Sequence, residues 1–158
     1  MIPVTIYSYG LMLAVAVVIC TFMLIQDARR NNIKADFIFD LVFWAVVGGI
    51  VGARLFYILL NLAFFIEQPN EIVMIHKGGL AWQGALIFGG LITVLFIKSK
   101  KMDVAATLDL LVPYLALGQS IGRIGCFLNG CCYGIKTALP WAVQFPILPH
   151  PVHPTQLY

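Results

Sequence analysis

The chain has 158 residues, of which 61% are hydrophobic and only 11% are charged, and its formal net charge is +3. This composition excludes an ordinary soluble domain, and the lack of a basic stripe argues against binding to nucleic acid. We therefore expect an all-α integral membrane protein.

Four apolar segments are long enough to cross a bilayer, which takes a helix of about 20 residues. They are expected at residues 9–25, 37–62, 80–97 and 104–121. The first follows an N-terminus that lacks the basic start of a cleavable signal peptide, so we interpret it as a retained span. After the fourth, five prolines between positions 140 and 154 exclude a long helix and predict an irregular segment. Together these parts are expected to form a single membrane domain over residues 1–158.

Basic residues mark the short connections after the first and third spans. These residues are Arg29, Arg30 and Lys34, and then Lys98, Lys100 and Lys101. Because Lys and Arg accumulate in cytoplasmic loops, this pattern predicts that the N-terminus lies outside. The end of the fourth span and the proline-rich segment are then expected at the outer face.

Two arginines are expected in the outer half of the membrane, Arg54 in the second span and Arg123 after the fourth. An arginine at this depth is costly and generally faces a cavity or a partner, and its guanidinium can bind a phosphate through two hydrogen bonds. The alternative is a structural pair with a carboxylate. The intramembrane acids Asp40 and Asp109, however, are expected near the inner ends of their spans. A lipid or substrate phosphate is therefore the predicted anion.

Tyr9 and Gln83 are expected at the same depth as the two arginines. Tyr9 is either an interfacial tyrosine or part of a site. Gln83 needs a hydrogen-bond partner, which a structural contact or a substrate could provide.

The segment from Gly122 to Gly134 combines Arg123, the amide of Asn129, three cysteines and four glycines. Glycine allows the backbone to approach a ligand closely, so this segment predicts the floor of an anion-binding site. Cys126, Cys131 and Cys132 are interpreted either as small apolar fillers or as a redox pair, because their spacing does not match the paired ligands of a structural metal site.

Further along the chain, His153 lies in the proline-rich segment, which could fold back over the site. Histidine is the natural proton acceptor near neutral pH, but an ordinary surface histidine is an equal alternative. Within the second span, Gly48 and Gly52 form a small-xxx-small pair, which predicts close helix packing.

Five motifs in this order resemble the bacterial prolipoprotein diacylglyceryl transferase family, and the resemblance covers essentially the whole chain. They are Tyr9-Gly10-Leu11-Met12, Gly52-Ala53-Arg54, Gly78-Gly79-Leu80-Ala81-Trp82-Gln83-Gly84, the segment Gly122 to Gly134, and His153-Pro154-Thr155-Gln156-Leu157-Tyr158.

The resemblance implies transfer of the diacylglyceryl group of phosphatidylglycerol to the thiol of a lipobox cysteine in a prolipoprotein, with release of glycerol phosphate. It implies a multi-pass protein of the bacterial inner membrane, with its site toward the outer leaflet and without a cofactor or metal. The implied catalytic positions are Arg123, Gln83 and His153, and the implied substrate-binding positions are Arg54, Tyr9, Asn129, Gly122, Gly125 and Gly134.

The sequence also departs from the family pattern. Gln83 stands where the family usually has histidine, Cys126 replaces an asparagine and Cys131 replaces a glutamate, and the family continues beyond Tyr158 with further spans. Two alternative functions follow from these departures. One is a membrane thiol-disulfide oxidoreductase, and the other is a non-catalytic phospholipid-binding paralogue.

Overall fold

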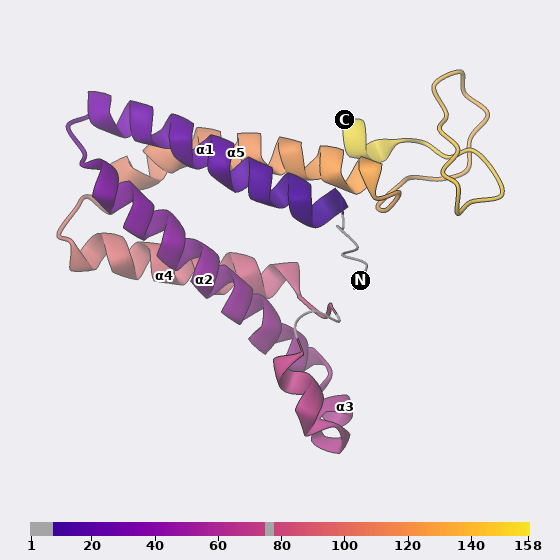
Figure 1. Cartoon of the computed structure of the whole chain (residues 1–158), viewed down its shortest axis with the longest axis horizontal. Helices are drawn as coiled ribbons and strands as arrows, with labels where there is room; N and C mark the ends of the chain where they lie inside the picture. Colours follow the sequence, from indigo (N-terminus) through magenta and orange to yellow (C-terminus); the bar gives the residue numbers. More distant parts are fainter. Residues whose placement is uncertain (1–7, 75–77) are drawn as a thin grey trace, which may run out of the picture. The chain divides into compact units, whose positions relative to one another are not determined.

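The computed structural model describes residues 8–74 and 78–158, and its long elements are all helices. Four of them are long and apolar enough to cross a membrane: α1 (Ser8–Arg30), α2 (Ala35–Leu60), α4 (Trp82–Ser99) and α5 (Val104–Leu128) (Figure 1). The expected fold class and the four apolar helices are therefore confirmed. Short helices α3 (Leu62–Glu67) and η1 (Pro69–Val73) follow α2, and η3 (Thr155–Leu157) lies near the end of the chain.

Helix α5 continues past residue 121 to Leu128. The first half of the glycine-rich segment, including Arg123 and Cys126, is therefore helical and forms the last two turns of α5. Side chains leave a helix in fixed directions, so this extension sets the directions of the Arg123 and Cys126 side chains.

Three helices end in the same type of turn, in which one residue with positive φ follows the helix. These residues are Asn32 after α1, Lys101 after α4 and Gly130 after α5, with φ between 56° and 65°. In each case the next amide reaches back to the helix, as in the bond from the N–H of Cys131 to the carbonyl of Cys126 at 3.1 Å. This is the Schellman motif, which satisfies carbonyls that would otherwise remain unpaired at a helix end.

The chain divides into two compact units, and residues 27–110 form one of them. Here α2 packs on α4 through small residues: a Cβ on Gly48 would meet Ile92, and a Cβ on Gly52 would meet Phe88 and, at 2.7 Å, the carbonyl oxygen of Gly84. The predicted packing role of the Gly48–Gly52 pair is confirmed. The close approach also allows the Ala81 N–H to donate to the carbonyl of Ala53 at 3.1 Å.

Residues 8–26 and 111–158 belong to the second unit, in which α1 and α5 run side by side (Figure 1). Their contact includes Gly118 against Cys20 and Gly125 against Met12. The segment after α5 has no long helix, as its prolines predict, and Lys136 and Val143 each form an isolated antiparallel bridge with Val152. Phe145 anchors this segment because it is buried, with the rings of Phe127 and Tyr133 packed against it.

Candidate functional site

Arg54 is 7% exposed and lies on α2, where backbone carbonyls surround its guanidinium. Nε donates to the carbonyl of Ile72 at 3.0 Å, and Nη1 donates to the carbonyls of Gly78 and Gly79 at 2.8 and 3.0 Å. Nη2 donates to the carbonyl of Glu71. The arginine therefore connects η1 and the glycines that precede α4 to α2.

Aromatic rings and positive-φ glycines complete this arrangement. The Arg54 guanidinium carbon lies 5.3 Å from the centre of the Phe65 ring and 5.9 Å from that of Tyr57. Gly78 and Gly79 have φ of 91° and 77°, and a Cβ on Gly79 would fall 2.7 Å from Nη1 of Arg54. A side chain at either glycine would be strained, so these residues allow the carbonyls to face the guanidinium.

Gln83 is exposed in the first turn of α4. Among the described residues its amide has no hydrogen-bond partner, so the alternative of a structural amide contact is not realised there. An exposed amide at a helix start can still contact a ligand, and the catalytic role of Gln83 stays a prediction.

Arg123 has a different environment from Arg54, although both were predicted to bind phosphate. It is half-buried near the end of α5, and its Nη2 donates to the carbonyl of Thr155 at 3.3 Å. Within the described ranges this is the side chain's only hydrogen bond. Most of its five N–H donors therefore remain available for a ligand.

Four other predicted residues lie in the same unit as Arg123, on α1, on α5 or directly after α5. The ring of Tyr9 is within 3.4 Å of the Cβ position of Gly125, which is buried between the two helices. Gly122 lies one turn earlier on α5 and faces open space, with nothing within 4 Å of its Cβ position. Asn129 follows the helix and is exposed. Gly125 thus serves helix packing, whereas the Cβ position of Gly122 is open.

His153 lies in the segment that returns to the end of α5. Its Nδ1 is 2.8 Å from the hydroxyl of Tyr158, and the rings of Trp141 and Tyr158 pack edge-on against it. Gly134 donates its N–H to the His153 carbonyl at 2.8 Å, and a Cβ on Gly134 would meet Thr155 at 2.7 Å. The small size of Gly134 therefore lets the returning segment lie close to the residues that follow α5.

Sequence reasoning missed Thr155 and Gln156, which join this segment to the cysteines. Gln156 is 2% exposed and donates to the carbonyl of Cys131 at 2.7 Å, and the hydroxyl of Thr155 donates to the carbonyl of Cys132 at 3.1 Å. Both belong to the motif from His153 to Tyr158. The motif indicated the family resemblance, but not the individual roles of these two residues.

The predicted site residues thus fall into two groups, one in each unit. Arg54 and Gln83 belong to the unit of residues 27–110. The other unit brings together the remaining predicted residues: Tyr9, Gly122, Arg123, Gly125, Asn129, Gly134 and His153.

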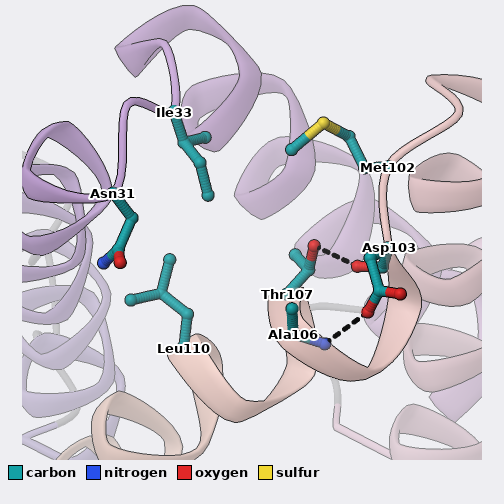
Figure 2. A pocket seen from close by; sticks show the side chains of 7 residues that line it. All are labelled: Asn31, Ile33, Met102, Asp103, Ala106, Thr107 and Leu110. Atoms are coloured by element: carbon teal, nitrogen blue, oxygen red, sulfur yellow. Dashed lines mark hydrogen bonds between the residues drawn. The ribbon is translucent and has the colours of Figure 1, made fainter.

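A pocket of about 480 Å³ lies at the turns between α1 and α2 and between α4 and α5. Figure 2 shows Asp103 in this pocket, where its carboxylate accepts the N–H of Ala106 at 2.7 Å and its carbonyl accepts the hydroxyl of Thr107 at 2.6 Å. These are the contacts of a helix N-cap, so the acidic side chain stabilises the start of α5.

The comparisons with known proteins agree with one another, and they cover nearly the whole chain. The sequence model of a family described as prolipoprotein diacylglyceryl transferase matches residues 1–158. A phosphatidylglycerol–prolipoprotein diacylglyceryl transferase of Clostridium tetani is 40% identical over 97% of this chain and 63% of its own length. Proteins with the same name from Trichormus variabilis and Pediococcus pentosaceus are 38% and 36% identical, over 99% and 93% of this chain and 58% and 52% of their own lengths. The chain thus spans between half and two thirds of these relatives.

Proposed function

This chain belongs to the prolipoprotein diacylglyceryl transferase family, and on that basis we propose that it acts in the transfer of diacylglyceryl from phosphatidylglycerol to a prolipoprotein. The acceptor is the thiol of the lipobox cysteine, and the reaction takes place at the outer leaflet of the bacterial inner membrane. No cofactor is needed, because the substrates contain both the nucleophile and the leaving group.

The observation that supports this proposal is the difference between the surroundings of the two arginines. Arg123 is half-buried, makes one long hydrogen bond and follows Gly122, whose Cβ position has nothing within 4 Å, whereas Arg54 is surrounded by carbonyls. A phosphate needs donors that are free and close to open space. Arg123 meets both conditions.

The transfer reaction requires a group that stabilises negative charge on a phosphate. The thiolate sulfur forms a bond to the glyceryl carbon, the bond from that carbon to the phosphate oxygen breaks, and its electron pair leaves with glycerol phosphate. Negative charge therefore grows on the phosphate as the reaction proceeds. Hydrogen bonds from the Arg123 guanidinium stabilise that charge, which is the most effective place for electrostatic catalysis.

His153 is the proposed acceptor of the thiol proton. When its Nδ1–H donates to the hydroxyl oxygen of Tyr158, its Nε2 is left with a lone pair that can accept a proton. Thr155, whose carbonyl contacts Arg123, is only two residues away in the same segment. Acceptor and charge-stabilising group can therefore act on the same substrate.

Tyr9 and Asn129 are proposed to supply hydrogen bonds to the substrate, and Gln83 remains a proposed catalytic position. For Arg54, the hydrogen bonds support a role in holding η1 and the glycines before α4 rather than the headgroup. It is thus proposed as a positioning residue.

The decisive experiment is complementation of transferase-depleted bacteria by the full-length protein. We expect Arg123→Ala to reduce lipoprotein modification by about 100-fold or more, as for loss of a group that stabilises transition-state charge. Arg123→Lys should recover part of the activity, because it keeps the charge without the two-pronged geometry. Lys136→Ala, an exposed change in the segment after α5, is the matched control.

Full rescue by Arg123→Ala would refute the proposed role of this residue. If the unmutated full-length protein binds phosphatidylglycerol vesicles but modifies no lipoprotein, the non-catalytic alternative is correct.

A further inference from the structure

The three cysteines that follow Arg123 converge on one point. Each thiol offers one sulfur, and the three sulfur atoms of Cys126, Cys131 and Cys132 all lie within 4.8 Å of one another. The thiols of Cys131 and Cys132 are 3.7 Å apart. The residues are free cysteines, with Cys132 exposed and the other two half-buried.

The turn after α5 produces this convergence. The Schellman motif at Gly130 brings the amide of Cys131 back to the carbonyl of Cys126 at 3.1 Å, and the Cys131 thiol also donates to that carbonyl at 3.6 Å. Cys132 then has φ of 62°, a conformation that costs about 1–2 kcal/mol for a residue other than glycine. Spacing in sequence did not predict a metal site, because the ligands come together through the turn.

The distances match those of a thiolate metal centre. With metal–sulfur bonds of about 2.3 Å, the sulfurs of a tetrahedral site lie about 3.8 Å apart. The observed separations, 3.7 Å for one pair and at most 4.8 Å for the others, lie within about 1 Å of this value. Soft thiolate ligands favour d¹⁰ cations such as Cu(I) and Zn(II).

We propose that Cys126, Cys131 and Cys132 form a three-thiolate site for a thiophilic cation, Cu(I) or Zn(II). Binding replaces three S–H protons, which pass to the solvent, by three metal–sulfur bonds. The exposed Cys132 provides the entry path, and a water or an external ligand would complete a zinc site.

An occupied site would stabilise the segment that carries His153. The carbonyls of Cys131 and Cys132 already accept hydrogen bonds from Gln156 and Thr155. A cation that fixes residues 131 and 132 therefore restrains residues 155 and 156 as well. This inference does not depend on the proposed transfer reaction.

The test uses the reduced full-length protein in detergent, dialysed without oxygen against Zn(II) alone or against Cu(I) alone. We expect about one equivalent of one of these metals to be retained, measured by mass spectrometry of the elements. Each of Cys126→Ser, Cys131→Ser and Cys132→Ser should weaken binding by at least about 10-fold, since even indirect changes around metal ligands have this effect. Cys20→Ser, which changes a thiol on α1, should bind normally.

Alkylation gives a second readout of the same site. The metal should protect the three clustered thiols from iodoacetamide and leave the labelling of Cys20 unchanged. The proposal fails if neither metal is retained, if the triple serine variant retains as much metal as the unmutated protein, or if neither metal protects the thiols.

Discussion

At the scale of single residues, two arginines with the same predicted role have different surroundings. Hydropathy and charge placed both at membrane depth, and a phosphate was the expected partner of each. Carbonyls of residues 71, 72, 78 and 79 instead surround Arg54, while Arg123 keeps most of its donors. A buried guanidinium can thus be satisfied by peptide dipoles instead of a counter-ion.

The hydrogen bonds of Arg54 predict how its substitution changes the thermal stability of the protein. Arg54→Ala would remove the hydrogen bonds from a charged guanidinium to four backbone carbonyls, and a hydrogen bond to a charged group typically contributes about 1.5–3 kcal/mol. We expect the midpoint of thermal unfolding in detergent to fall clearly for Arg54→Ala and to stay unchanged for Arg123→Ala. Equal effects of the two substitutions would show that the hydrogen bonds of Arg54 to η1 and to the glycines before α4 do not stabilise the fold.

Two glycines on α5 allow packing to be separated from substrate binding. Gly122→Ala places a methyl group in open space beside Arg123, whereas Gly125→Ala places one 3.0 Å from Cβ of Met12. We expect Gly122→Ala to keep its thermal stability but to raise KM for phosphatidylglycerol by about 10-fold, since one methylene in a binding pocket changes binding by about 1–3 kcal/mol. Gly125→Ala should lower stability, and a Gly122→Ala enzyme with normal KM would place the lipid elsewhere.

At the scale of elements, the helices associate through small residues and end in defined turns. Glycine on both α2 and α4 lets the backbones meet, which is the main source of helix association where no hydrophobic force acts between lipid-facing surfaces. The Schellman turns at Asn32, Lys101 and Gly130 then set the direction in which the chain leaves each helix.

Helix α4 contains a matched pair of glycines for testing this packing. A Cβ on Gly84 would meet the carbonyl oxygen of Gly52 and Cβ of Phe56, while a Cβ on Gly90 would meet nothing within 4 Å. Gly84→Ala should therefore destabilise the protein by about 1–3 kcal/mol through overpacking. Gly90→Ala should be neutral or stabilise it by up to about 1 kcal/mol through its higher helix propensity. The measurement is thermal unfolding of both variants in the same detergent. A similar loss of stability in both variants would contradict the close packing of Gly84 on α2.

At the scale of the whole molecule, the four apolar helices and the basic loops predict an N-terminus outside the cytoplasm. A membrane-impermeant maleimide tests this in full-length protein that keeps Cys132 as its single cysteine, and in a cysteine-free form with Lys34→Cys. We expect Cys132 to be labelled in intact spheroplasts and Lys34→Cys only after permeabilisation. The opposite pattern would reverse the topology and place the proposed site at the wrong leaflet.

The sequence by itself determined the membrane class, the four helices and the family, because hydropathy, span length and ordered motifs are properties of short stretches of chain. It also indicated that Gly48 and Gly52 pack helices, since small residues at this spacing have few other uses in a span. Only the tertiary structure decided which arginine keeps free donors and which cysteine sulfurs meet. The reason is physical: the carbonyls around Arg54 come from residues 17 to 25 positions away, and the sulfurs meet through a turn whose geometry depends on the backbone of Gly130.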